Sequence, residues 1–295
     1  MSRLVSLFLT AMLLLAAPVA FAAAPAKKAP PAAKAASTKA DPFPTSARAY
    51  LTRVGGTTVW AHQADQKLPP ASLTKVMTAL LVLERADLNA IVTVKPTIVE
   101  ETGTKLNLRP GDQLLVRDLL AAMLIESDND AARALAEHVA GAENRFVALM
   151  NQRAVQLGMK NTRYTNCAGH HDPNHYSTAN DLVLVTETAL AKPVFRELVA
   201  KAGAEIATID GQRRFKLETS NKLLPKYAGM QGVKTGYTPQ AGRCLIALAE
   251  RDGVEVLIVL LRAKDRWNLA TKMLDSAFER YAYRSNDQKA VVAKR

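Results

Sequence analysis

The stretch PPASLTKVMTALL, residues 69–81, begins with two prolines and continues as an apolar helix. Within it, Ser72 and Lys75 stand three residues apart, a spacing that places two side chains on one face of a helix. The residues around Lys75 are among the most apolar of the chain. Lys75 is therefore either a surface residue whose ammonium group reaches solvent or a buried amine with a chemical task.

Two further short motifs follow along the chain. The SDN motif, residues 127–129, lies between two predicted helices, and the KTG motif, residues 234–236, lies in a predicted strand. Each motif alone is a weak signal, because a Ser-x-x-Lys is expected by chance about once in a chain of this length. All three in this order are typical of penicillin-binding proteins and class A β-lactamases.

The first motif suits nucleophilic catalysis. A serine hydroxyl needs a base within hydrogen-bond reach to take its proton, and a neutral Lys75 would lie one turn from Ser72. We expect burial and the like charge of Lys234 to lower the pKa of Lys75. The backbone N–H of Ser72, at the start of the helix, would face a developing oxyanion. The structural alternatives are a helix N-cap for Ser72 and a solvated position for Lys75.

The other two motifs suit proton transfer and substrate binding. We expect Ser127 to relay a proton to the leaving amine and the amide of Asn129 to hold a substrate peptide group. Lys234 and Thr235 would bind a carboxylate, while Gly236 lets the substrate backbone approach the strand. The structural alternatives are that Ser127 or its neighbour caps a helix, and that the KTG motif is an ordinary edge strand.

The order of predicted elements indicates the fold class. Strands are expected at both ends of the domain and helices in the middle. This order favours an α/β (α+β) fold, in which both chain ends build one antiparallel sheet of about five strands, with helices packed on it and a mostly helical insertion. Thr178 and Asp181 form a predicted capping box. The expected strands are 47–54, 57–63, 229–238, 242–250 and 254–263, with 204–209 and 213–219 also extended, and the expected helices after the first are 116–125, 129–141, 143–159, 177–191 and 266–282.

The N-terminal residues differ in composition from the rest. Residues 1–22 combine a positive start, a short apolar run and an Ala-Phe-Ala end, which predicts a cleaved signal peptide rather than a transmembrane anchor. We therefore expect export to the periplasm or cell envelope. Residues 23–45 are rich in Ala, Pro and Lys and are predicted to form a disordered tether. The catalytic domain is predicted over 46–283, followed by a basic tail over 284–295.

The chain has 295 residues, a net charge of +12 and a pI near 9.7. Export and the scattered basic residues argue against nucleic-acid binding, whereas weak association with an anionic envelope through the basic tether is plausible on charge grounds. Cys167 and Cys244 would meet an oxidising compartment, and whether they pair is left open by the sequence.

Beyond the three motifs, the segments SDNDAARALAEHV, MNQRAVQLGMKNTRYTN and GVKTGYTPQAGRCLIALAE resemble the low-molecular-mass serine penicillin-binding proteins over about residues 46–283. These are D-alanyl-D-alanine carboxypeptidases and endopeptidases of peptidoglycan. The resemblance implies acylation of Ser72 by stem peptides ending in D-Ala-D-Ala, with Lys75 as base and Ser127 as proton relay. It also implies that Lys234 anchors the terminal carboxylate and that the N–H groups of Ser72 and Tyr237 form the oxyanion hole. The same resemblance implies that β-lactam antibiotics are covalent inhibitors and that no cofactor or metal is needed.

The chain departs from the family pattern at two places. Only 12 residues follow Tyr283, whereas relatives often carry a second domain and a C-terminal membrane helix. The short C-terminal segment raises the expectation of an endopeptidase. His170 stands where relatives often place leucine, which leaves substrate contacts of that loop open. The function most favoured is a carboxypeptidase removing terminal D-Ala, and the main alternative is an endopeptidase cutting crosslinks.

Three less favoured functions have specific sequence arguments. His171, Asp172 and His175 have ligand-like spacing for zinc, but Pro173 prevents the helix that would aim both histidines; bracing of the loop is the favoured role. A class A β-lactamase would carry a Glu-x-x-Leu-Asn segment between the second and third motifs, and this chain has none. A non-catalytic wall-binding protein would not need the serine at all.

Overall fold

The computed structural model describes residues 41–43 and 45–292, with side chains described as far as Arg280. The predicted signal peptide and most of the predicted tether therefore lie outside the described residues. Within the described part of the chain, no helix is both long enough and apolar enough to cross a bilayer.

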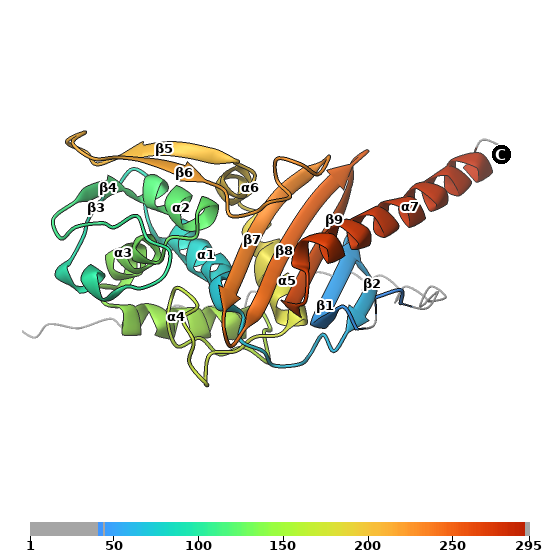
Figure 1. The fold of residues 1–295 in the computed structure, drawn as a ribbon, viewed down its shortest axis with the longest axis horizontal. Coiled ribbons are helices and arrows are strands. Elements are labelled where there is room, and N and C mark those ends of the chain that lie inside the picture. The colour runs from blue at the N-terminus through green and yellow to red at the C-terminus, as the bar shows by residue number, and fades with distance from the viewer. Residues whose placement is uncertain (1–40, 44, 293–295) are drawn as a thin grey trace, which may run out of the picture. The chain divides into compact units, whose positions relative to one another are not determined.

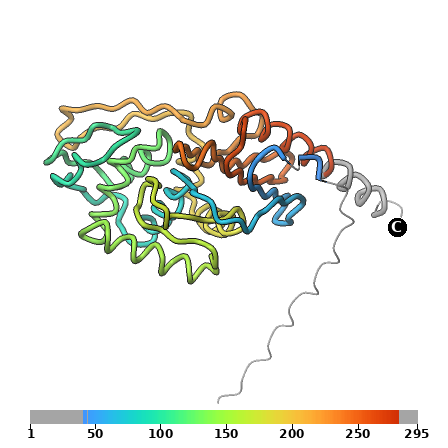
Figure 2. The backbone as a smooth tube through the Cα atoms, turned by 60° about the horizontal axis from the view of Figure 1, so that its bottom comes forward, coloured from blue at the N-terminus to red at the C-terminus, as the bar shows by residue number. Residues whose placement is uncertain are grey.

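One antiparallel sheet is built from both ends of the domain, as predicted (Figure 1). Its strand order is β2-β1-β9-β8-β7, so the N-terminal hairpin pairs directly with the last strand and β7 forms one edge. Figure 2 shows from a second side that the blue N-terminal hairpin and the red C-terminal segments lie together. The strands are β1 (Ala47–Val54), β2 (Thr57–His62), β7 (Met230–Thr238), β8 (Gly242–Arg251) and β9 (Val254–Ala263).

Both faces of the sheet are covered, which explains the continuous apolar runs of its central strands. Alternate residues of a strand point to opposite faces. Ala247 and Ile258 accordingly belong to the core under α7 (Arg266–Val292), whereas Ile246 and Val259 belong to the larger core on the helical side. The sequence prediction ended this last helix near residue 282, but the helix continues through most of the predicted basic tail.

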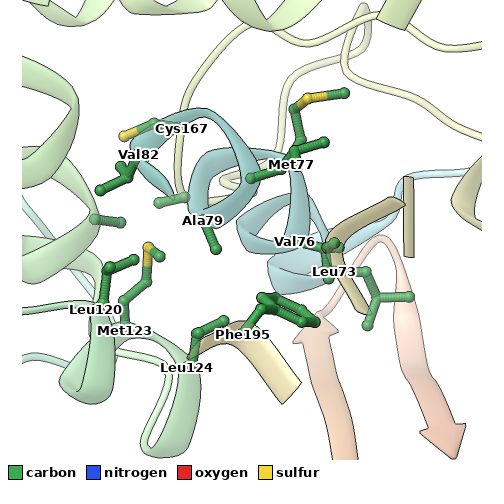
Figure 3. Packing of buried hydrophobic residues seen from close by; sticks show 14 of the residues in the cluster. Leu73, Val76, Met77, Ala79, Val82, Leu120, Met123, Leu124, Cys167 and Phe195 are labelled. Atoms are coloured by element: carbon green, nitrogen blue, oxygen red, sulfur yellow. The ribbon is translucent and has the colours of Figure 1, made fainter. Parts of the chain in front are cut away.

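The insertion between β2 and β7 is mostly helical, also as predicted. Its central helix, α1 (Lys75–Arg85), is buried from Lys75 to Val82 and is surrounded by apolar side chains from several segments (Figure 3). A helix that is apolar on all sides belongs in a core. The other helices are α2 (Val116–Ile125), α3 (Asn129–Ala140), α4 (Glu143–Gln156), α5 (Ala179–Leu190) and α6 (Pro193–Val199), with short 3-10 helices at Ala71–Thr74 and Pro96–Glu100.

Two small ribbons complete the fold. The pair β5 (Gly203–Ala207) and β6 (Arg214–Glu218) coincides with the two segments expected to be extended, while β3 (Ile91–Thr93) and β4 (Gln113–Leu115) were not predicted. Strands of three residues are too short to show a clear alternation of polar and apolar residues.

The capping box predicted at the start of α5 forms only in part. Thr178 Oγ1 accepts a hydrogen bond from Asp181 N, as predicted. The carboxylate of Asp181 accepts instead from Asn161 N and Thr162 Oγ1, and thereby ties the preceding loop to the helix.

Candidate active site

The turn that carries Ser72 packs against the edge strand β7. A Cβ atom added to Gly236 would lie 3.1 Å from the carbonyl oxygen of Pro70 and 3.2 Å from the backbone nitrogen of Ser72. The absence of a side chain at Gly236 therefore lets the protein's own backbone approach the strand. This contact brings the first and third motifs together.

The structure places Ser72 in the 3-10 turn before α1, not at a helix N-cap. Ala71, which precedes it, has a φ of +49°, a value that is uncommon for a residue other than glycine. On the other side of the turn, a Cβ atom on Gly169 would lie 2.0 Å from Ala71 O and 2.9 Å from Ser72 N. Backbone on both sides thus fixes the position of the serine.

Lys75 is the first residue of α1 and is fully buried, so it is not a solvated surface lysine. Its Nζ contacts Ser72 Oγ at 3.1 Å, Asn129 Oδ1 at 2.6 Å and the carbonyl oxygen of Ala168 at 2.7 Å. Burial lowers the pKa of Lys75 to about 8, against the opposing effect of nearby negative charges. The expected lowering is present, and burial is its largest cause.

The SDN motif forms the turn between α2 and α3. Ser127 is buried with a φ of +83°, and among the described residues its side chain has no hydrogen bond with either lysine. Asp128 occupies the N-cap position but its side chain makes no capping bond; burial raises its pKa to about 8. Asn129 uses its amide internally, accepting from Lys75 and donating to the carbonyl oxygen of Thr102 at 2.5 Å.

The KTG motif lies in β7. Lys234 is 1% exposed, and its Nζ donates to the carbonyl oxygen of Thr235 at 3.2 Å. Burial, and then the positive charge of Lys75, hold the pKa of Lys234 well below its usual value. Thr235 Oγ1 lies 2.7 Å from Ser220 Oγ. By contrast, the Tyr237 residue is 61% exposed.

Arg266 is a contributor that no sequence motif indicated. It lies at the start of α7, and its Nη1 donates to the carbonyl oxygens of Gly236 at 2.8 Å and Cys244 at 3.0 Å. A guanidinium group that bridges two neighbouring strands holds the edge of the sheet in place beside the site. Only the fold brings it there, because residues 236 and 266 are joined by two intervening strands.

Two histidines of the loop after α4, His170 and His175, contact other segments of the protein. His175 is buried, with Nε2 2.8 Å from Thr74 Oγ1 and Nδ1 accepting from Thr165 N at 3.1 Å. Burial lowers the pKa of His175 to about 4, so the ring is neutral near pH 7. His170 Nε2 instead lies 2.8 Å from Glu101 Oε2. In the described residues no group of histidine, cysteine and carboxylate side chains is arranged to hold a metal ion.

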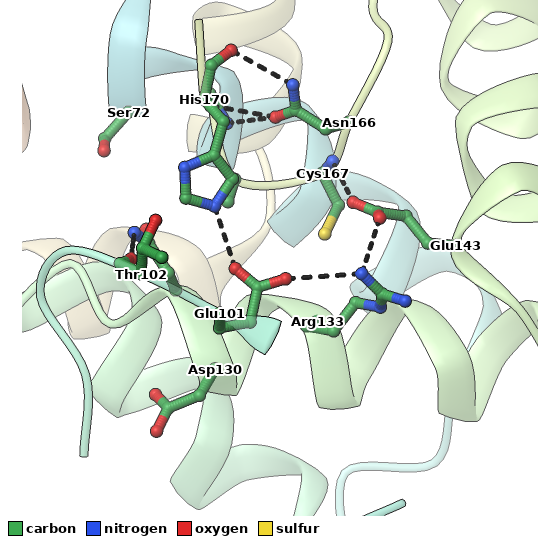
Figure 4. Close-up of polar contacts among 12 residues, drawn as sticks. Ser72, Glu101, Thr102, Asp130, Arg133, Glu143, Asn166, Cys167 and His170 are labelled. Atoms are coloured by element: carbon green, nitrogen blue, oxygen red, sulfur yellow. Dashed lines mark hydrogen bonds and ion pairs between the residues drawn. The ribbon is translucent and has the colours of Figure 1, made fainter. Parts of the chain in front are cut away.

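The two cysteines are both buried and free, so the disulfide left open by the sequence does not form. Cys167 N donates to Glu143 Oε1 at 3.0 Å, within a network that also includes Arg133 and Glu101 (Figure 4). No sequence motif indicates this network, since its members come from four separate segments.

Comparison with known proteins finds relatives over most of this chain. A family model described as D-alanyl-D-alanine carboxypeptidase matches residues 37–265. The D-alanyl-D-alanine carboxypeptidase DacF of Bacillus subtilis is 34% identical over 78% of this chain, which spans only 61% of that relative's length. The carboxypeptidase DacC of Escherichia coli is 33% identical over 91% of this chain and 67% of the relative.

A D-alanyl-D-alanine endopeptidase of Pseudomonas aeruginosa is equally similar, at 33% identity over 70% of this chain and 68% of that protein. Among solved structures, the crystal structure of the Streptomyces K15 DD-transpeptidase superposes with a TM-score of 0.74 at 31% identity, covering 79% of this chain and 97% of that one.

Proposed function

Since this chain belongs to the D-alanyl-D-alanine carboxypeptidase family, we propose that it removes the terminal D-Ala from peptidoglycan stem peptides through an acyl-enzyme on Ser72. The observation that carries the proposal is the 3.1 Å contact between Lys75 Nζ and Ser72 Oγ, made by a lysine that is fully buried. Burial favours the neutral amine, which is the form that can accept the serine proton.

Acylation follows from this contact. Lys75 takes the proton of Ser72 as Oγ attacks the carbonyl of the penultimate D-Ala. The backbone N–H groups of Ser72 and Tyr237 would hold the oxyanion. Ser127 would then pass a proton to the departing amine of the terminal D-Ala, and water would release the shortened peptide from Ser72.

Substrate binding is assigned to β7. An extended peptide would lie along this edge of the sheet, as peptides do when they add a strand to a sheet. Lys234 and Thr235 would bind the terminal carboxylate, whose negative charge compensates the buried ammonium group of Lys234. Asn129 would hold a substrate peptide group only after exchanging its internal contact with Thr102 or Lys75.

Endopeptidase cleavage of peptidoglycan crosslinks is the second candidate, because it needs the same acyl-enzyme and differs only in the leaving group. The exposed Tyr237 beside the KTG motif leaves that end of the strand accessible. The similar endopeptidase of Pseudomonas aeruginosa supports the same candidate. β-Lactamase activity and non-catalytic wall binding have no comparable support.

The deciding experiment incubates purified protein with pentapeptide monomers and with crosslinked dimers, and identifies the products by mass. A carboxypeptidase releases D-Ala from the monomers, whereas an endopeptidase converts dimers to monomers. The matched control is Ser72→Ala, which should abolish both reactions. Activity that survives Ser72→Ala but is lost with EDTA would overturn the serine mechanism in favour of a metal-dependent one.

We further propose that the protein is exported to the periplasm or cell envelope, from the pattern of residues 1–22. The basic tether would add weak attraction to anionic envelope polymers, and β-lactam antibiotics would act as covalent inhibitors. The N-terminal sequence of protein recovered from the envelope fraction tests the export proposal, which expects a mature chain starting after Ala22.

A further inference from the structure

His170 and Glu101, which belong to none of the three motifs, contact each other beside Ser72 (Figure 4). His170 Nε2 lies 2.8 Å from Glu101 Oε2. The carboxylate side chain is only 5% exposed, whereas the histidine side chain is 35% exposed. The pair therefore combines a buried acidic group with an imidazole that solvent can reach.

The partner of His170 determines which nitrogen of the ring is protonated. An ionised carboxylate only accepts hydrogen bonds, and Glu101 is also paired with Arg133 Nη1 at 3.4 Å. Nε2 of His170 must then carry a hydrogen, which leaves an unshared electron pair on Nδ1 of the neutral ring. Nδ1 has no hydrogen-bond partner among the described residues. Figure 4 shows the ring between Ser72 and Glu101, with this nitrogen directed away from the carboxylate.

The backbone around His170 is held close to the nucleophile. Asn166 Oδ1 accepts from the backbone nitrogens of Gly169 and His170, and Asn166 Nδ2 donates to the carbonyl oxygen of His170. Gly169 itself packs so closely on the serine turn that a Cβ atom there would lie 2.9 Å from Ser72 N. The segment next to Glu101 is tied to the site as well, through the hydrogen bond from Asn129 to Thr102 O.

Hydrolysis of an acyl-enzyme requires a base for the attacking water. Lys75 is the base that faces Ser72 Oγ, and its Nζ is also held by Asn129 Oδ1 and the carbonyl oxygen of Ala168. The site therefore has one base directed at Ser72 Oγ and a second, the Nδ1 atom of His170, which has no partner in the part of the chain that the structure describes.

We propose that His170 is the general base for hydrolysis of the acyl-enzyme on Ser72, with Glu101 as the residue that positions it. The inference rests on the proposed function. The water oxygen forms a bond to the acyl carbon while its proton moves to His170 Nδ1. The tetrahedral intermediate then breaks the bond between the acyl carbon and Ser72 Oγ, and the proton returns to Oγ. The products are the free serine and the peptide acid.

The test separates acylation from hydrolysis in the full chain. A depsipeptide that ends in D-lactate instead of D-Ala acylates through a more reactive ester, so that hydrolysis limits turnover. Intact-protein mass spectrometry of quenched samples gives the fraction of acyl-enzyme, and the rate of penicillin labelling reports acylation independently. The variants are His170→Ala, His170→Leu, which keeps the bulk of the side chain, and Glu101→Gln. The neighbouring exposed histidine supplies the matched control, His171→Ala.

We expect both His170 variants to accumulate acyl-enzyme and to hydrolyse it on the order of 100-fold more slowly, with penicillin labelling unchanged. Added imidazole should restore hydrolysis in His170→Ala, where space is available, but not in His170→Leu. Glu101→Gln should show a smaller loss of hydrolysis, and His171→Ala should behave as the wild type.

Hydrolysis at the wild-type rate in both His170 variants would overturn the proposal. A loss that falls equally on acylation and hydrolysis would also overturn it, since His170 would then shape the site without acting as a base. The lack of any imidazole response in His170→Ala would overturn it as well. A wild-type protein that never forms an acyl-enzyme would overturn the proposed function itself, a result distinct from these.

Discussion

The Nζ atom of Lys75 lies 3.1 Å from the Oγ atom of Ser72, and the lysine is fully buried. The pair therefore places a serine hydroxyl beside an amine whose charged form is disfavoured by its surroundings. Lys75 is the first residue of α1, and the turn that carries Ser72 lies directly before this helix. The apolar helix therefore positions both the lysine amine and the serine hydroxyl.

The first prediction concerns pH. Lys75 must be neutral to accept a proton, and its pKa is lowered to about 8. Acylation by penicillin should therefore rise about tenfold per pH unit below that pKa and level off above it. Stopped-flow labelling over a pH series measures this rate. Lys75→Arg, which stays charged, should not be labelled at any pH, and a flat profile in the wild type would count against a lysine base.

At higher pH the rate should fall again as Lys234 loses the proton that binds a carboxylate. The pKa of Lys234 is held well below its usual value by burial and by the charge of Lys75. The falling limb should therefore begin at lower pH than an exposed lysine would give.

The second prediction concerns Lys234→Ala. A hydrogen bond to a charged group contributes about 1.5–3 kcal/mol, so kcat/KM should fall roughly tenfold to a hundredfold. Folding should survive, because the substitution removes a buried charge. Lys234→Arg should restore activity only partly, since it keeps the charge but changes the geometry. The exposed lysine in β6 provides the control Lys216→Ala, and equal activity in the two alanine variants would remove Lys234 from the site.

The third prediction concerns Gly169→Ala. The φ of Gly169 is +93°, and a Cβ atom there would lie 2.0 Å from Ala71 O. The control is Gly111→Ala, because Gly111 has a similar φ of +91° but, among the described residues other than its chain neighbours, no atom within 4 Å of an added Cβ. Backbone strain alone costs about 1–3 kcal/mol and should appear in both variants.

Only Gly169→Ala should also displace the serine turn and suppress penicillin labelling. Chemical denaturation and labelling rates, measured on the same preparations, compare the two variants. Equal losses of stability with full labelling in both would show that the contact between Gly169 and the serine turn has no role in catalysis.

The fourth prediction concerns Arg266→Ala. Loss of its bonds to Gly236 O and Cys244 O should loosen β7 beside the site and reduce kcat/KM. The expected loss corresponds to about 1.5–3 kcal/mol. Arg243→Ala removes a more exposed arginine whose Nη1 donates to Lys264 O, and it should leave activity within about twofold. Steady-state assays of both variants measure the difference.

The fold and the first contacts of the site could be predicted from the sequence because they rest on local patterns. Apolar strands at both ends of the domain predicted the five-stranded sheet, and Ser72 and Lys75 are neighbours on one turn. The contacts missed join segments far apart in the chain. Asn129 to Thr102 O, Arg266 to Gly236 O and His170 to Glu101 have no periodicity that a sequence pattern could show.

One expectation was met only in part, and one question left open by the sequence was answered, for the same reason. The capping box at Thr178 is half formed because the Asp181 carboxylate finds partners from the preceding loop. Cys167 and Cys244 remain free, each buried in its own surroundings. In both cases the tertiary structure decides which partner a side chain meets, and residue type alone leaves that choice open.

The most direct test of the central claim is intact-protein mass spectrometry after a short pulse of penicillin, followed over time. We expect one adduct per molecule, located on the peptide that contains Ser72 and absent in Ser72→Ala. We also expect release far slower than acylation, because the retained leaving group obstructs water and the chain has no Glu-x-x-Leu-Asn segment between Asn129 and Lys234. Rapid return to the unmodified mass with steady drug turnover would make the protein a β-lactamase. The absence of any adduct on Ser72 would contradict the account.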